Sequence, residues 1–252
     1  MSVAALQYRL STLNALLGVV EALRSLTAAK QQKALSLLPA LDAYAGEAAQ
    51  VIALLHPEPA ATEGVVTLVL GPDGGFTGGL AGRIAAAIPD GWCPLVVGTR
   101  TEAALCARRW PVGEVRAAST SVEALPALAA SLADTLPASA SIAVLSPQGN
   151  EIVRTDLPPL PRRTGRHDLL TQMPGPALLA AAGRQDRVAQ LLRLLLANHI
   201  AEQMARLATL TGARERIRDR CASLSVQLSM ARQDGISQEI ADLWAGRRII
   251  QH

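Results

Sequence analysis

The stretch that comes closest to a chemical motif is the glycine cluster "GPDGGFTGGL", residues 71–80. It follows a short β-branched run and precedes an Ala- and Leu-rich segment, which is where phosphate-binding loops occur in nucleotide-binding proteins. Its spacing fits neither the Gly-x-Gly-x-x-Gly fingerprint nor the nucleoside triphosphate loop, which requires Gly-Lys-Ser/Thr. We therefore interpret it first as a tight turn between a strand and a helix, with phosphate binding as the weaker alternative.

Other side chains that could do chemistry are scattered along the chain. No histidine has a carboxylate or cysteine partner at the i,i+4 spacing typical of a metal site, and all four are expected at the surface: His56, His167, His199 and His252. The three cysteines form no Cys-x-x-Cys pair, so a reducing compartment fits best. No Gly-x-Ser-x-Gly or other nucleophile motif is present. We expect no catalytic residue, no cofactor and no metal.

The composition argues against nucleic acid and membrane insertion. Half of the residues are apolar but only 2% are aromatic, so the core is built from Ala, Leu, Val and Ile. The net charge of +3 is too small to indicate nucleic acid, and the basic stretch 213–220 alternates in sign as a solvated helix face does. No uninterrupted apolar run reaches the ~18 residues of a membrane span. We expect a soluble chain without a signal peptide or a transmembrane segment of its own, attached to a membrane only through partners.

The elements around the glycine cluster fall into three segments. Residues 1–55 are expected to form a helix whose apolar residues alternate in steps of three and four, as in a coiled-coil seam: Val3, Leu6, Leu10, Leu13, Leu17 and Val20. Pro39 should kink or break this helix. Residues 65–160 change period, with short β-branched runs at 65–70, 94–98 and 141–146 separated by amphipathic stretches. That pattern predicts a small Rossmann-like α/β domain with a largely parallel sheet.

The third segment, residues 175–252, is helical again and would extend roughly 110 Å if continuous. Ile217, Cys221, Leu224 and Leu228 repeat the seam of the first segment. The fold class is therefore α/β, with a long antiparallel coiled coil of the N- and C-terminal helices plus the α/β domain. In the C-terminal helix, Arg232 and Glu239 lie on one face two turns apart. Spacing alone leaves two alternatives open, a contact with a partner and intrahelical pairing on a solvated surface.

The C-terminal stretch "RQDGISQEI", residues 232–240, resembles the gamma subunit family of F-type ATP synthases. In that family the C-terminal helix carries Arg-Gln-x-x-Ile-Thr-x-Glu-Leu, then an acidic residue and Gly-Ala; here Asp242 and Gly246 follow. The family's Glu-x-Ala-Ala-Arg-Met motif resembles "EQMARL", residues 202–207. The C-terminal motif is the most specific part of the resemblance.

Two further stretches carry the resemblance. The family's N-terminal pattern, Arg-Ile-x-Ser-Val and later Ala-Met-x-Met-Val-Ala-x-x-Lys-x-x-Lys, is similar to "RLSTL" at 9–13, continuing at Leu23, Lys30 and Lys33. Its Asp-x-Gly-Leu-Cys-Gly turn resembles "DGGFTG", residues 73–78. Residues 85–150 match poorly.

The resemblance implies the central rotor shaft of an ATP synthase or ATPase. The α/β domain would bind the epsilon subunit and the membrane ring of c subunits, and the coiled coil would transmit torque to the alpha and beta subunits. Catalytic residues would lie on the beta subunits, so the chain itself would be no enzyme. The implied rotor–stator contacts are Leu23, Lys30, Arg232, Gln233 and Glu239. The implied location is the cytoplasmic face of the bacterial inner membrane, as a peripheral protein, with the coupling ion (proton or sodium) and a second, divergent ATPase left open.

Two other classes of protein remain as alternatives. One is a small Rossmann-like nucleotide-binding enzyme with helical extensions, which would need a phosphate loop or an acid/base set. The other is a coiled-coil adaptor without a motor role, which leaves the C-terminal motif unexplained.

Overall fold

The computed structural model describes the chain except for residues 1, 56, 59–61, 120, 162–173 and 250–252, and except for the side chains of 242 and 244–249. It forms two compact units, one made of Met1–Leu26 with Leu207–His252 and the other of Thr27–Arg206. We call them the coiled-coil unit and the α/β unit. The three-segment division drawn from the sequence stays a prediction.

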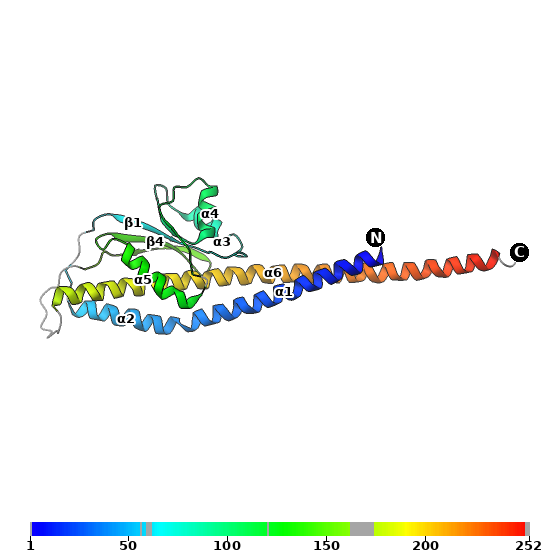
Figure 1. The fold of residues 1–252 in the computed structure, drawn as a ribbon, viewed down its shortest axis with the longest axis horizontal. Helices are drawn as coiled ribbons and strands as arrows, with labels where there is room; N and C mark the ends of the chain where they lie inside the picture. Colours follow the sequence, from blue (N-terminus) through cyan, green and yellow to red (C-terminus); the bar gives the residue numbers. More distant parts are fainter. Residues whose placement is uncertain (1, 56, 59–61, 120, 162–173, 250–252) are drawn as a thin grey trace. The chain divides into compact units, whose positions relative to one another are not determined.

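Three long helices account for both ends of the chain (Figure 1). They are α1 (Val3–Ser36), α2 (Leu38–Leu54) and α6 (Gly175–Ile249). The break between α1 and α2 confirms the effect of Pro39, which lies in the first turn of α2, where its missing N–H costs no helical hydrogen bond. α6 is unbroken through Gly183 and Gly212.

The coiled-coil unit is held by the predicted seam. Leu6 of α1 is buried in one cluster with Leu224 and Leu228 of α6, and Val3, Leu10, Leu13 and Ala231 pack against it. Farther along α1, Glu21 pairs with Arg214 and Arg218. Low numbers on α1 therefore meet high numbers on α6, which confirms an antiparallel coiled coil.

The α/β unit contains a five-stranded sheet in the order β3-β2-β1-β4-β5. Its strands are β1 (Val65–Leu70), β2 (Leu95–Val97), β3 (Val115–Arg116), β4 (Ser141–Gln148) and β5 (Glu151–Leu157). The first four are parallel, which confirms the largely parallel sheet, and only β5 runs antiparallel, against β4. Its helices are α3 (Leu80–Ala87), α4 (Thr99–Ala107) and α5 (Leu125–Thr135), with a 3-10 turn η1 (Val122–Ala124) before α5.

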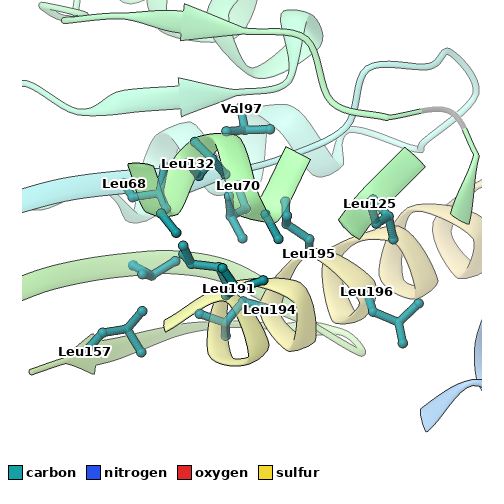
Figure 2. Packing of buried hydrophobic residues seen from close by; sticks show 14 of the residues in the cluster. Leu68, Leu70, Val97, Leu125, Leu132, Leu157, Leu191, Leu194, Leu195 and Leu196 are labelled. Carbon is teal, nitrogen blue, oxygen red and sulfur yellow. The ribbon is translucent and has the colours of Figure 1, made fainter. Parts of the chain in front are cut away.

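Both faces of the sheet are covered, which explains why the central strands β1 and β2 and most of β4 read as continuous apolar runs. Leu68 and Leu70 of β1 point to one face, where α5 and α6 supply Leu132, Leu191 and Leu195 (Figure 2). Val69, between them in sequence, points to the other face and packs with α3 and α4. Figure 1 shows the same layers, with α3 and α4 on one side of β1 and β4, and α5 and α6 on the other.

One finding differs from the sequence expectation about membranes. By length and composition alone, the helical stretch of residues 3–54 qualifies as a candidate membrane span. The same stretch is divided at Leu37 into α1 and α2, and it contributes buried residues such as Ala34 and Leu41 to the core of the α/β unit. The absence of a transmembrane segment stays a prediction.

Candidate functional site

The glycine turn 71–79 lies at the carboxyl end of β1, between that strand and α3. Its first residue is fixed to the neighbouring strand, because the Gly71 N–H donates to the Val97 carbonyl at 2.8 Å. Asp73 then accepts a hydrogen bond from the backbone N–H of Thr99, the first residue of α4, at 2.6 Å. The carboxylate thus satisfies one of the unpaired N–H groups at the start of that helix. In this way Asp73 fixes the turn to α4.

The other side of the turn is held by three polar side chains of α6. Asn198 donates from Nδ2 to the Gly71 carbonyl at 3.3 Å. Glu202 accepts at Oε1 from the Gly74 N–H at 3.2 Å. Arg206 donates from Nε to the Gly75 carbonyl at 3.1 Å. The structure therefore brings together two motifs that the sequence singled out 130 residues apart, the "DGGFTG" turn and "EQMARL".

Glu202 and Arg206 also bind each other. The guanidinium donates to Glu202 Oε1 at 2.5 Å and to Gln203 Oε1 at 2.9 Å. The side chains of Glu202 and Arg206 are 7% and 18% exposed, so this ion pair is largely withdrawn from water. A charge-assisted hydrogen bond is stronger and shorter than a neutral one in such surroundings. We call Asn198, Glu202, Gln203 and Arg206 the α6 clamp.

The clamp explains why the turn contains glycine at position 74. A Cβ added there would lie 2.1 Å from the guanidinium of Arg206 and 2.9 Å from Glu202 Oε1. A side chain at position 74 would push aside the ends of the Glu202 and Arg206 side chains that hold the turn. Glycine allows these two groups to approach the backbone closely.

The same contacts bear on the phosphate alternative. In a phosphate loop, free backbone N–H groups and a lysine face the anion. Here the Gly74 N–H already donates to the Glu202 carboxylate, an anion supplied by the chain itself. The turn contains no lysine. The geometry favours the tight-turn interpretation.

Sequence reasoning missed Asn198 and Gln203, which are 3% and 2% exposed. Asn198 lies outside the quoted family motifs, and Gln203 occupies the variable position of "EQMARL". For Asn198 the available signal was spacing, since Asn198, Glu202 and Arg206 recur every four residues and so share one face of α6. A row of polar residues on one face of a helix normally indicates that the face is exposed to solvent.

The expectation that His199 lies at the surface is wrong. His199 is 2% exposed in the α/β unit, and no hydrogen bond of ordinary geometry joins either ring nitrogen to a described residue. Burial lowers its pKa below the ordinary 6.5, and the nearby charges of Lys30 and Arg206 lower it further. Glu123 opposes them, and the Ser119 backbone lies close enough to favour the charged imidazole and so raises the pKa slightly. The imidazole is therefore neutral near pH 7. His56, His167 and His252 lie outside the described residues.

The two lysines of the N-terminal motif differ in their surroundings. Lys33 pairs with Glu123 of η1, and its hydrogen bond is the main cause that lowers the pKa of that carboxyl to about 2. Lys30 is exposed, and its positive charge is one cause of the lowered pKa of His199. Leu23, in the coiled-coil unit, is 38% exposed. Lys30 belongs to the α/β unit, whereas Leu23 and the C-terminal candidates belong to the coiled-coil unit.

The C-terminal candidates lie on a part of α6 beyond the seam. Within the described part of the coiled-coil unit, the last α6 residue packed against α1 is Ala231. Arg232, Gln233 and Glu239 are all exposed, and no hydrogen bond or ion pair joins any of them to another described residue. Among the side chains that the structure describes, the intrahelical pairing that spacing left open is therefore not formed. The side chain of Asp242 lies outside the described part.

The same stretch exposes apolar side chains. Ile236, Ile240 and Leu243 are 58%, 50% and 73% exposed. Their spacing of four and three places them on the face that also carries Arg232 and Glu239. We call residues 232–243 the distal segment. Among the described residues, no group of three or more metal-ligating side chains is present.

The fold class is that of long terminal helices that contribute both to an antiparallel coiled coil and to an α/β unit with a doubly covered sheet. The family model for ATP synthase matches residues 2–248. The chain belongs to this ATP synthase family, as a gamma subunit, and is a central stalk subunit.

Solved structures agree on the fold. The rotor of the Euglena gracilis mitochondrial ATP synthase in rotational state 1 is similar with a TM-score of 0.62 at 12% identity, over 93% of this chain and 98% of that one. The OSCP/F1/c-ring structure of the same organism's enzyme in rotational state 3 gives 0.67 at 11% identity, over 98% and 94%. The central stalk and c-ring structure from Tetrahymena thermophila gives 0.59 at 15%, over 77% and 99%. A comparison with curated proteins finds no match.

Proposed function

We propose that this chain is the non-catalytic rotating shaft of an F-type ATP synthase and that its distal segment turns inside a ring of alpha and beta subunits. The observation that supports the proposal is the exposure of apolar side chains on the distal segment. Among the described residues, apolar packing of α6 against α1 ends at Ala231, and the distal segment beyond it exposes Ile236, Ile240 and Leu243 on one face. Exposed apolar rows mark interaction surfaces, and an isolated helix is marginal in water.

The charges of the distal segment fit a contact that changes with rotation. Arg232 and Glu239 lie within the apolar face and are unpaired among the described residues. An asymmetric helix presents different groups to each surrounding subunit as it turns. A ligand-driven conformational cycle requires such differential contacts. Arg232, Gln233 and Glu239 are therefore proposed as rotor–stator contacts, with Leu23 and Lys30 as further candidates on α1.

The α/β unit is proposed to bind the epsilon subunit and the ring of c subunits. The solved relatives are described as parts of a rotor, a central stalk and an F1/c-ring assembly, which supports this placement. The protein would then be peripheral to a membrane-bound complex. The cytoplasmic face of a bacterial inner membrane is the location proposed from the sequence, whereas the solved relatives are mitochondrial.

The proposal is tested by removing the distal segment. A chain ending at Ala231 keeps the seam residues Leu6, Leu224 and Leu228, so its coiled coil should form as before. We expect circular dichroism to show a melting midpoint close to that of the full chain. We also expect the shortened chain to lose stable binding to an alpha–beta assembly in gel filtration. Equal binding by both chains would contradict the proposed contact.

A further inference from the structure

We propose that the α6 clamp is a torque joint, in which Asn198, Glu202 and Arg206 are positioning residues that lock the glycine turn of the α/β unit onto α6. The inference rests on the proposed rotor function. If α6 turns as a shaft, the α/β unit must turn with it without slipping. The clamp is one feature of the α/β unit suited to prevent slip, beside Arg187 of α6, which donates to the Pro137 and Pro158 carbonyls at 3.0 Å.

Three hydrogen bonds join α6 to the glycine turn. On α6 the three side chains are spaced by four residues, so they form one row along the helix. On the turn they meet the Gly71 carbonyl, the Gly74 N–H and the Gly75 carbonyl in order. A slip of one helical turn, about 5.4 Å, would take every side chain away from its partner. The match therefore fixes the register.

Apolar packing alone does not fix register in this way. The core between the sheet and α6 is made largely of Leu, Val and Ala side chains, whose attraction is non-directional. Hydrogen bonds are directional and weaken steeply when bent or stretched. In a buried setting, a slipped clamp would also leave the Gly74 N–H and the Arg206 guanidinium without partners. Slip is opposed by the polar contacts far more than by the apolar ones.

Glu202 is the central member of the clamp. Its Oε1 is shared by the Gly74 N–H of the turn and the guanidinium of Arg206, which in turn holds Gly75. Removing this carboxylate would free one contact directly and leave the Arg206 cation buried without its counter-charge. The Glu202 carboxylate thus acts as an internal anion, placed where related sheets bind a phosphate.

A matched control lies on the same helix and the same unit. Arg184 of α6 forms a two-point pair with Asp134 of α5, with Nε–Oδ1 and NH2–Oδ2 distances of 2.7 and 2.8 Å. This pair is exposed and does not touch the glycine turn. Asp134→Ala therefore removes an α6 ion pair without opening the clamp.

The first arm of the test uses the isolated full chain. In Glu202→Ala, amide hydrogen exchange in the peptide covering residues 71–79 should speed up at least tenfold, with strands β1 and β4 unchanged. Added formate should slow it again by filling the vacated anion position. Glu202→Gln, which can still accept from Gly74, should exchange at an intermediate rate. Unchanged exchange in Glu202→Ala would overturn the clamp, whatever the protein's role in a complex.

The second arm uses the assembled, membrane-bound complex. Glu202→Ala should lower ion pumping per ATP hydrolysed severalfold while ATP hydrolysis continues, and Asp134→Ala should match the wild type. A loosened turn with unchanged pumping per ATP would overturn the torque role. Failure of the wild-type chain to join an alpha–beta assembly would count against the proposed function instead, and hydrogen exchange would still decide whether the clamp exists.

Discussion

Glu21 of α1 accepts a hydrogen bond from Nε of Arg214 on α6 at 3.0 Å, and this ion pair joins residues nearly 200 positions apart in the chain. Together with the packing of Leu6 against Leu224 and Leu228, it sets the register of the coiled coil. Extending that register along α1 places Leu13 opposite Cys221. Because Cys221 is a native cysteine, one introduced cysteine at position 13 is enough to test for a disulfide across the seam.

We predict that Leu13→Cys forms an intramolecular disulfide with the native Cys221 under mild oxidation. The facing side chains of an antiparallel seam are close enough for the geometry of such a bond. The bridge is detected as a faster-migrating band on non-reducing gels and by mass spectrometry. Adding Cys221→Ala should abolish it, and Leu17→Cys, one turn away, should cross-link far less. Equal yields from positions 13 and 17 would contradict the register.

We predict that His199 makes the chain less stable as the pH falls below 6.5. Its pKa is lowered in the folded state by burial and by Lys30 and Arg206, so the unfolded chain binds the proton more readily. Stability is therefore complete above pH 6.5 and is lost between 6.5 and the lowered pKa, by up to about 1.4 kcal/mol per pH unit. The depressed pKa of Glu123 acts only below 4.5.

The measurement is the urea midpoint of the wild type and of His199→Leu between pH 5 and 8. The variant should show a much flatter dependence between pH 6.5 and 5, because it has no imidazole to protonate. Parallel curves for the two proteins would show that His199 does not titrate differently in the folded state.

We predict that the isolated chain binds no Mg-ATP with micromolar affinity. The turn lacks a lysine, and its Gly74 N–H is already donated to Glu202. Isothermal calorimetry at pH 7.5 should show no saturable heat. A micromolar site that is lost on Gly74→Ala would favour the nucleotide-binding enzyme over the shaft.

The helices and the sheet were predictable because their periodicities are strong. The 3-4 seam at Leu6 and Leu228 indicates a helix by its period, whereas β1 is indicated as a strand by its short length and β-branched composition. The antiparallel direction of β5 was not predicted. Its sequence alternates in the same way whichever direction it pairs, and its direction is set by the tight turn after Gln148.

The polar part of the site was only half predictable. The family motifs pointed to Glu202 and Arg206, but Asn198, His199 and Gln203 looked like ordinary solvated residues of a helix. They are buried because this part of α6 is covered on more than one side, by the sheet, by the glycine turn and by residues Ser119 and Glu123. Periodicity identifies one apolar face. Periodicity does not show whether a second segment packs on the polar face of the helix and forms hydrogen bonds with its side chains.

The proposed contact between the distal segment and a surrounding ring is tested most directly by Arg232→Glu. Arg218 is unsuitable as a control because it pairs with Glu21, so the matched variant is Arg220→Glu, an exposed arginine of the same helix. In the free chain both changes should alter stability by only about 0.5 kcal/mol, as expected for exposed helical charges.

In the assembled complex the two variants should differ in assembly or ATP turnover. Arg232 would be desolvated and paired with a carboxylate of the ring, and breaking such a pair costs roughly 3–5 kcal/mol. The measurement is the ATP turnover of complexes reconstituted with each variant, with subunit content checked on gels. The shaft account predicts that Arg232→Glu lowers assembly or turnover at least tenfold while Arg220→Glu stays within twofold of the wild type. Equal turnover of the two variants would contradict it.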